Sequence, residues 1–219
     1  MKTAIIAGAS GLTGTHLVKL MLQSSTYNTV KILVRKPMDI EHSSLQQIVY
    51  DYEYPAPEVI KADDVYCCLG TTIKKAGSRE AFKKVDYEYP LQVARIAHQN
   101  GAQKFSVISA IGANPKSKIF YNRVKGQVEE AIKEIPFEAI YILRPSMLLG
   151  KRKEFRFGEE TAKIIMRPLN FLLPKNIKPI HASQVAACVL DKMNSNEKGI
   201  QVVFSGQMQK YPVISKELY

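Results

Sequence analysis

A tyrosine and a lysine four residues apart, Tyr121 and Lys125, form the pair of side chains best suited to chemistry in this sequence. Positions four apart share one face of a helix. A phenol titrates near ~10, and a neighbouring ammonium group favours its ionised form. Tyr121 could therefore donate a proton to a carbonyl oxygen as hydride arrives, or accept one in the reverse direction. Lys125 could also hold a nicotinamide ribose, and Ser109 would hydrogen-bond and orient the carbonyl oxygen.

The tyrosine–lysine spacing is weak by itself, because the sequence contains 11 tyrosines and many lysines. Tyr27 and Lys31 have the same spacing, but this pair runs into a predicted strand, where residues four apart share no helical face. Tyr121 is better placed, on a predicted helix over residues 121–135 that follows a predicted strand ending at Ser109. The alternative for Tyr121 is an ordinary surface tyrosine.

Three glycines, Gly8, Gly11 and Gly14, follow a short apolar run over residues 3–7 and precede helical spacing from Thr15. Strand, glycine turn and helix are the context of a dinucleotide fingerprint, in which the pyrophosphate meets the unpaired N–H groups of a helix N-terminus. An ordinary turn between strand and helix is the alternative. The residues expected to contact the cofactor here are Gly8, Ser10, Gly11, Leu12, Thr13 and Gly14.

The predicted second strand, residues 29–35, ends in Arg35 and Lys36 and has no carboxylate there. A carboxylate at this point binds the ribose of NAD, whereas a guanidinium can clamp the 2′-phosphate of NADP with paired hydrogen bonds. Arg35 and Lys36 therefore predict NADP, and NADPH in preference to NADH. Two solvated charges at a strand end are the alternative.

Two further strand ends supply candidate cofactor contacts. Asp51 and Tyr52 follow a predicted strand at 47–50 and could meet the adenine, although a turn cap is an equal alternative for Asp51. The predicted strand 64–69 leads into a small-residue turn, where a glycine leaves room for a cofactor. The residues expected to contact the cofactor at this second turn are Leu69, Gly70, Thr71 and Thr72.

Strands alternate with helices along the whole chain, which predicts an α/β fold with a doubly wound parallel sheet and helices on both faces. The expected strand order is 3-2-1-4-5-6-7, within a single domain over residues 1–219. One long helix is expected from Ser78 or Arg79 to Gly101. Residues 150–181 are not needed by the sheet and predict a small cap over the substrate, including a helix that ends near residue 173. Arg152 and Arg156 in this segment could bind an anionic substrate or be solvated charges.

Composition narrows the functional class. The formal net charge is +11, which fits either nucleic acid or a basic surface around the site of a polyanionic cofactor. The lysines are scattered and no nucleic-acid motif is visible, so the second interpretation is favoured. Three cysteines without metal-ligand spacing indicate a reducing, cytoplasmic environment. The histidines are dispersed, so no metal site is expected, and no apolar run is long enough to span a membrane.

With these motifs in place, the sequence resembles the atypical short-chain dehydrogenase/reductases, and among them the Tat-interactive-protein-like oxidoreductases. The matching stretches are GASGLTG (8–14), CCLGTT (67–72), FKKVDYEY (82–89), FYNRVKGQVE (120–129) and LRPSMLLGKR (143–152). The resemblance implies a Rossmann fold, NADP binding and catalytic roles for Ser109, Tyr121 and Lys125. It also implies that Pro145, Ser146, Met147 and Leu148 lie near the nicotinamide.

The sequence departs from the broader superfamily at two points. Asp86 stands where many members have an asparagine that completes a proton relay, and only twelve positions separate Ser109 from Tyr121. The first hypothesis is an NADP-dependent oxidoreductase that transfers hydride to a small carbonyl substrate, or from an alcohol, as a monomer or homodimer. The second is an NADPH-binding redox sensor or regulatory protein with little catalysis.

Overall fold

A single seven-stranded parallel sheet forms the centre of the molecule, in a computed structural model that describes residues 2–150, 174 and 176–214. The order β3-β2-β1-β4-β5-β6-β9 confirms the predicted 3-2-1-4-5-6-7, because β9 is the seventh strand of this sheet along the chain. The strands are β1 (Thr3–Ala7), β2 (Thr29–Val34), β3 (Leu45–Val49), β4 (Asp64–Cys67), β5 (Lys104–Ile108), β6 (Ala139–Arg144) and β9 (Gly199–Phe204).

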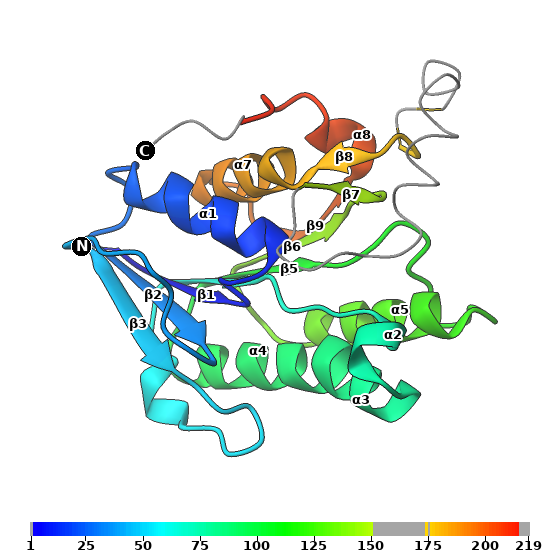
Figure 1. The fold of residues 1–219 in the computed structure, drawn as a ribbon, viewed down its shortest axis with the longest axis horizontal. Coiled ribbons are helices and arrows are strands. Elements are labelled where there is room, and N and C mark those ends of the chain that lie inside the picture. The colour runs from blue at the N-terminus through cyan, green and yellow to red at the C-terminus, as the bar shows by residue number, and fades with distance from the viewer. Residues whose placement is uncertain (1, 151–173, 175, 215–219) are drawn as a thin grey trace.

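Helices cover both faces of this sheet, as the alternation of strands and helices predicts (Figure 1). Helices α1 (Leu12–Leu22) and α7 (Ala182–Asn194) lie on one face, and α4 (Tyr89–Gln99) and α5 (Phe120–Lys133) lie on the other. Strands β4 and β6, each of which lies between two other strands, are therefore buried along almost their whole length, which agrees with their mostly apolar sequences.

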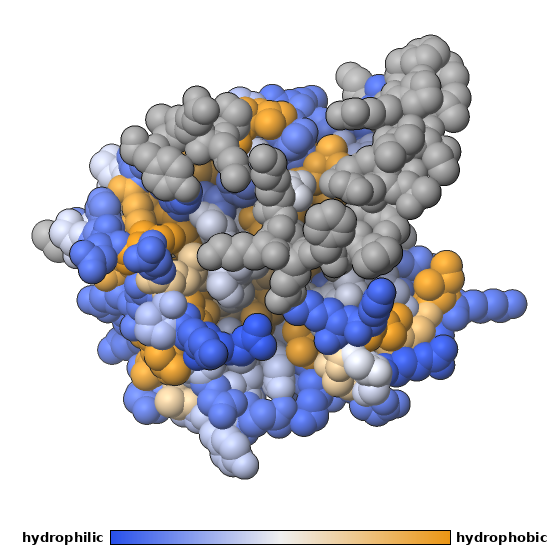
Figure 2. Space-filling model, viewed as in Figure 1, coloured by the Kyte–Doolittle hydropathy of each residue, from blue (hydrophilic) through white to orange (hydrophobic). Residues whose placement is uncertain are grey.

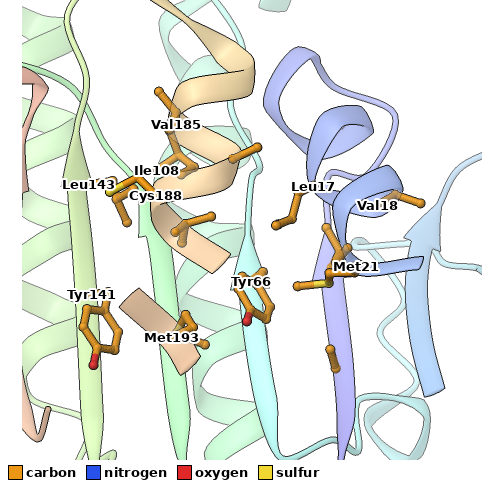
Figure 3. Packing of buried hydrophobic residues seen from close by; sticks show 14 of the residues in the cluster. Leu17, Val18, Met21, Tyr66, Ile108, Tyr141, Leu143, Val185, Cys188 and Met193 are labelled. Atoms are coloured by element: carbon orange, nitrogen blue, oxygen red, sulfur yellow. The ribbon is translucent and has the colours of Figure 1, made fainter. Parts of the chain in front are cut away.

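The face beneath α1 and α7 shows how the sequence pattern becomes a core (Figure 3). Leu17 and Met21 of α1 and Val185 of α7 are fully buried in one cluster against the sheet, in which Tyr66 lies beside Met21. Spacing of about four residues puts the apolar side chains of each helix on one stripe. The two helices also contact each other, so the glycine turn that begins α1 is held by a rigid layer.

The predicted long helix from Ser78 or Arg79 to Gly101 is present as a continuous helical run over residues 79–99, but it is not a regular α-helix throughout. It is divided into α3 (Arg79–Lys83), a π-helical turn (Lys84–Glu88) and α4. Pro90 has no N–H to donate to the carbonyl of Asp86, so the regular hydrogen-bond ladder is interrupted at this turn. A short helix, α2 (Ile73–Ala76), precedes α3. Asp86 thereby lies on a π turn packed against α5.

Several small elements lie outside the sequence prediction. They are a 3₁₀ turn (Pro57–Val59), a two-stranded parallel sheet of β7 (Leu148–Leu149) and β8 (Ile180–His181), and α8 (Ser205–Met208). Most of the predicted cap, including its helix, Arg152 and Arg156, lies outside the described residues. Among the residues that are described, no helix combines the length and apolarity needed to cross a membrane.

Candidate active site

The glycine turn after β1 is packed so closely that two of its glycines have no room for a side chain. Gly8 has φ +81°, and a Cβ there would lie 2.7 Å from the backbone of Cys68. A Cβ on Gly14 would lie 2.2 Å from the carbonyl oxygen of Gly8. Gly8 and Gly14 therefore bring the end of β1, the end of β4 and the start of α1 together. This agrees with the roles expected of the first and third fingerprint glycines.

Gly11 is different, because its surroundings leave the start of α1 open. It is the N-cap residue of α1, and no side chain caps the helix there. A Cβ on Gly11 would lie 3.2 Å from the carbonyl oxygen of Gly8, the nearest atom. The free N–H groups of this first turn, with their partial positive charge, form the kind of place where a phosphate binds.

The other predicted residues of this turn lie around the same opening. Ser10 is exposed, Thr13 is buried, and Leu12 lies beside Gly150, where a Cβ would be 2.6 Å from the Leu12 side chain. The segment after β6 therefore passes beside the glycine turn. The structure thus brings residues near 150 to the first turn of α1, as a cofactor site between these segments requires.

A buried ion pair lies at the carboxyl ends of β4 and β5. The ammonium nitrogen of Lys125 is 2.8 Å from Oδ1 of Asp86, and the two side chains are 4% and 0% exposed. Oδ2 of Asp86 accepts a hydrogen bond of 2.8 Å from the backbone N–H of Thr71, and Lys125 also donates to the carbonyl oxygen of Ile108 at 3.4 Å. Asp86 thus joins α5 to the turn after β4.

The electrostatics of this pair favour a charged lysine. Burial disfavours the ammonium form, but the carboxylate of Asp86 and the hydroxyl of Tyr121 more than offset this, so the pKa of Lys125 lies above its usual range. Its contacts with Asp86 and Ile108 leave at least one of its three N–H groups for a ligand. A Cβ on Gly70 would lie 3.7 Å from the lysine nitrogen, so this glycine borders the pair.

Tyr121 lies one helical turn before Lys125, in the first turn of α5, and is half-buried. Its ring packs against Phe82 of α3, with ring centroids 5.5 Å apart. The predicted spacing therefore does place the phenol and the ammonium on one helical face, beside the small-residue turn after β4. This is the arrangement needed for proton donation at an oxygen bound at this edge of the sheet.

Ser109 is directed at a carboxylate that the sequence analysis missed. Its hydroxyl donates a short hydrogen bond to Glu129, which is fully buried and also paired with Arg144 of β6 at 2.5 Å. The hydroxyl has one hydrogen, so in this arrangement the Ser109 oxygen is left as an acceptor. Donation to a carbonyl oxygen would require this bond to break. Glu129 was detectable in principle, because it follows Lys125 by four residues on the same face of α5.

The predicted adenine and phosphate contacts lie together at the ends of β2 and β3. Arg35 and Lys36 are exposed. Burial raises the pKa of the Tyr52 phenol, and the Arg35 guanidinium counteracts this in part, so the two side chains are close. Asp51 accepts a hydrogen bond of 2.9 Å from the N–H of Glu53, which supports its alternative role as a turn cap.

The remaining predicted contacts are distributed over two segments. Thr72 caps α2 by accepting a hydrogen bond from the N–H of Lys75, so its hydroxyl serves the backbone. Leu69 is partly buried and packs against the apolar core on the α4 face of the sheet. Beyond β6, Pro145 accepts a hydrogen bond from the N–H of Ile111, which joins the ends of β5 and β6.

Ser146 points toward the short elements after β6. Its hydroxyl donates to the carbonyl oxygen of Lys178 and accepts from Ser205 at 2.9 Å. Met147 and Leu148 continue into β7, where the carbonyl oxygen of Met147 accepts from the N–H of Ile180. The side chain of Ser146 is therefore occupied within the protein, and this segment offers a cofactor its backbone and apolar groups.

Two cysteines at the end of β4 are reactive side chains of another kind. Burial raises the pKa of the Cys67 thiol to about 12, and that of Cys68 is also raised by burial, so neither is a ready nucleophile. Within the described part of the chain, no group of three or more histidine, cysteine or acidic side chains could hold a metal ion.

Comparison with known proteins agrees with this geometry. Residues 8–191 match the sequence model of a family described as NAD(P)H-binding. Protein HTATIP2 of Rattus norvegicus is 36% identical over 168 residues, which cover 74% of this chain and 69% of that protein. The FMP52 protein of Candida albicans, named as mitochondrial, is 35% identical over 198 residues and 86% of each chain.

Solved structures show the same fold at low sequence identity. A UDP-N-acetylglucosamine 4-epimerase from Methanobrevibacter ruminantium has a TM-score of 0.71 at 17% identity, over 93% of this chain and 76% of that one. MoeE5, solved with UDP-glucuronic acid and NAD, has a TM-score of 0.72 at 16% identity, over 91% of this chain and 75% of that one. The chain therefore belongs to the NAD(P)H-binding family and is related to HTATIP2 and FMP52, which is consistent with its resemblance to the atypical short-chain dehydrogenase/reductases.

Proposed function

We propose that this protein is an NADP-dependent oxidoreductase that transfers hydride to a small carbonyl substrate. One observation carries the proposal. Tyr121 and the Lys125–Asp86 ion pair lie at the carboxyl ends of the central strands, beside the open first turn of α1. In a doubly wound sheet this edge is where a dinucleotide and its substrate meet.

The chain's own groups divide the work in a simple way. When bound, NADPH would supply the hydride to the carbonyl carbon. Tyr121 would give its phenolic proton to the carbonyl oxygen, so that an alcohol forms and a proton from solvent restores the phenol. Lys125 would use a remaining N–H group for a ribose hydroxyl, and its positive charge would favour release of the proton from Tyr121.

The fit of the cofactor rests on the turns that surround the site. Gly11 and the uncapped start of α1 suit a pyrophosphate, and Gly70 leaves space beside Lys125. Arg35 and Lys36 carry two exposed positive charges at the end of β2, where a 2′-phosphate would gain charge-assisted hydrogen bonds. These features support NADPH as the preferred cofactor.

The test is to mix the purified protein with NADPH and a panel of aldehydes and ketones, and to follow the loss of cofactor absorbance. Tyr121→Phe keeps the ring that packs on Phe82 but removes the transferable proton. We expect this variant to lose at least about a hundredfold in turnover, in line with the usual contribution of acid catalysis, while its affinity for NADPH stays close to wild type. Equal turnover in the two proteins would remove Tyr121 from the mechanism.

The second candidate, an NADPH-binding sensor with little catalysis, is favoured by one specific observation. The hydrogen of the Ser109 hydroxyl is donated to Glu129, so Tyr121 alone would polarise a bound carbonyl group. Tight binding of NADPH by calorimetry, with no oxidation in the presence of any carbonyl compound, would favour this candidate over the first.

A further inference from the structure

Two loops border Tyr121 on the substrate side, and their charges are strongly biased. One follows β4 and leads through α2 into α3; the other follows β5 and leads into α5. Along the sequence, no aspartate or glutamate occurs between Glu88 and Glu129. The first loop and α3 contain several basic residues and Glu80. We define the basic rim as Arg79, Lys116, Lys118 and Arg123.

Two of the rim residues, Arg79 and Arg123, are brought together around one aromatic side chain. The guanidinium of Arg79 lies 5.2 Å from the centre of the Phe120 ring, and that of Arg123 lies 5.7 Å from it. Phe120 directly precedes Tyr121 and also packs against Phe82 of α3, with ring centroids 5.9 Å apart. Two positive charges are therefore held next to the residue expected to donate the proton.

Some basic side chains elsewhere are paired with carboxylates. On the opposite edge and outer faces, Lys198 pairs with Glu138 and Lys133 pairs with Glu130. Within the described residues, the four side chains of the basic rim have no ion pair with a carboxylate. Beside Tyr121, the positive charge of the basic rim is thus not neutralised by an ion pair among the described residues.

Apolar side chains lie among these charges. Ile73, Ile111 and Ile119 are 37%, 38% and 62% exposed, and all three belong to the same two loops. Figure 2 shows hydrophilic residues with a few apolar ones among them over the region where Figure 1 places α2, α3 and the start of α5. A ligand that matches this surface has an apolar body and a negatively charged group.

We propose that the substrate of this site is an anionic carbonyl compound, with an apolar body and a carboxylate or phosphate group that the basic rim attracts. The proposal rests on the proposed function, and it adds the chemical class of the substrate. A small molecule is favoured over a membrane or a protein because the biased charge lies on the two loops that carry Gly70 and Tyr121, rather than on a separate face.

The experiment compares matched aldehydes: 4-carboxybenzaldehyde, its neutral methyl ester and 4-formylphenyl phosphate. With NADPH in low salt, we expect kcat/KM for the anions to exceed that for the ester by roughly tenfold, and the ratio to fall as salt screens the rim. The two anions show which charged group is preferred. Arg79→Gln/Lys116→Gln/Lys118→Gln should bring the ratio close to one, while turnover of the ester is unchanged.

The matched control removes three basic groups far from the site, in Lys133→Gln/Lys192→Gln/Lys198→Gln, and should keep the ratio. Equal kcat/KM for ester and anions in wild type, or a ratio that the rim variant leaves intact, would overturn the proposal. Binding to phosphatidylserine vesicles that depends on the rim, without any preference among the aldehydes, would overturn it in favour of a membrane surface.

A second readout separates this proposal from the proposed function. Calorimetry with 4-(hydroxymethyl)benzoate and the NADPH-loaded protein needs no turnover. Binding that is at least about tenfold weaker for benzyl alcohol or for the rim variant supports the anionic site even if no aldehyde is reduced. Absence of binding to wild type contradicts the anionic site even if neutral aldehydes are reduced.

Discussion

The ion pair between Asp86 and Lys125 is the feature whose removal has the clearest expected result. Asp86→Asn keeps the shape of the side chain and an oxygen that can accept from the N–H of Thr71. It leaves the ammonium of Lys125, only 4% exposed, without its counter-charge. Removal of one partner of a buried pair destabilises a protein by about 3–5 kcal/mol.

The lower end of that range applies here, because Lys125 retains the carbonyl oxygen of Ile108 and can also lose its proton. A loss of about 3 kcal/mol corresponds to a fall in Tm of about 6–12 °C for a domain of this size. Asp86→Asn/Lys125→Met removes both charges and should recover most of this loss, since a buried pair replaced by neutral groups is often tolerated. The double variant should nevertheless bind NADPH more weakly than wild type, because it lacks the lysine that would hold the ribose.

Thermal unfolding followed by circular dichroism at pH 7 measures the Tm of the single and the double variant. Calorimetry with NADPH measures the cofactor affinity of the double variant. Glu138→Gln is the matched control: its pair with Lys198 has a similar distance of 2.7 Å but is exposed, so the Tm should stay close to wild type. An Asp86→Asn variant as stable as wild type, or a double variant no more stable than the single one, would refute the reasoning.

Two further perturbations test the cofactor site. Gly14→Val should lower the free energy of unfolding by about 3 kcal/mol or more, because its Cβ meets the Gly8 carbonyl. Gly11→Val should instead lower NADPH affinity at least about tenfold, with a smaller loss of stability. Urea unfolding measures the stability and calorimetry the affinity, and equal effects of the two variants would contradict the division of roles. Arg35→Asp should lower NADPH affinity roughly tenfold to a hundredfold, which is the value of one screened charge-assisted hydrogen bond. Titration of the variant with NADPH and with NADH measures the effect. A variant that still prefers NADPH would show that Arg35 does not bind the phosphate.

The sequence alone was sufficient for the order of the main sheet and for the glycine turn. Both depend on local patterns: apolar runs of strand length, helical spacing between them, and glycines at positions where a Cβ has no room. Gly8 and Gly14 show this directly, since the backbone contacts that exclude a side chain lie in the turn itself or in the residues that directly follow the adjacent strand β4. The right-handed connection between parallel strands then leaves few possible topologies.

The helix predicted over residues 78–101 marks where local patterns stop being sufficient. Its periodicity is helical throughout, yet Pro90 removes one N–H and the chain accommodates this with a π turn at Lys84–Glu88. That turn puts Asp86 against α5. The position of the carboxylate therefore depends on how a helix irregularity packs, which no periodicity encodes.

Tertiary structure alone decided the partners of the candidate catalytic residues. Lys125 meets Asp86, 39 residues earlier, and Ser109 meets Glu129 on a helix whose face also carries Tyr121. The sequence placed these groups near one edge of the sheet, because strand ends and helix faces follow from spacing. Which hydroxyl is free to donate, and which ammonium is balanced by a carboxylate, depends on contacts between elements that are distant in the sequence. Those contacts form only when the helices pack on the sheet and burial forces each polar group to find a partner.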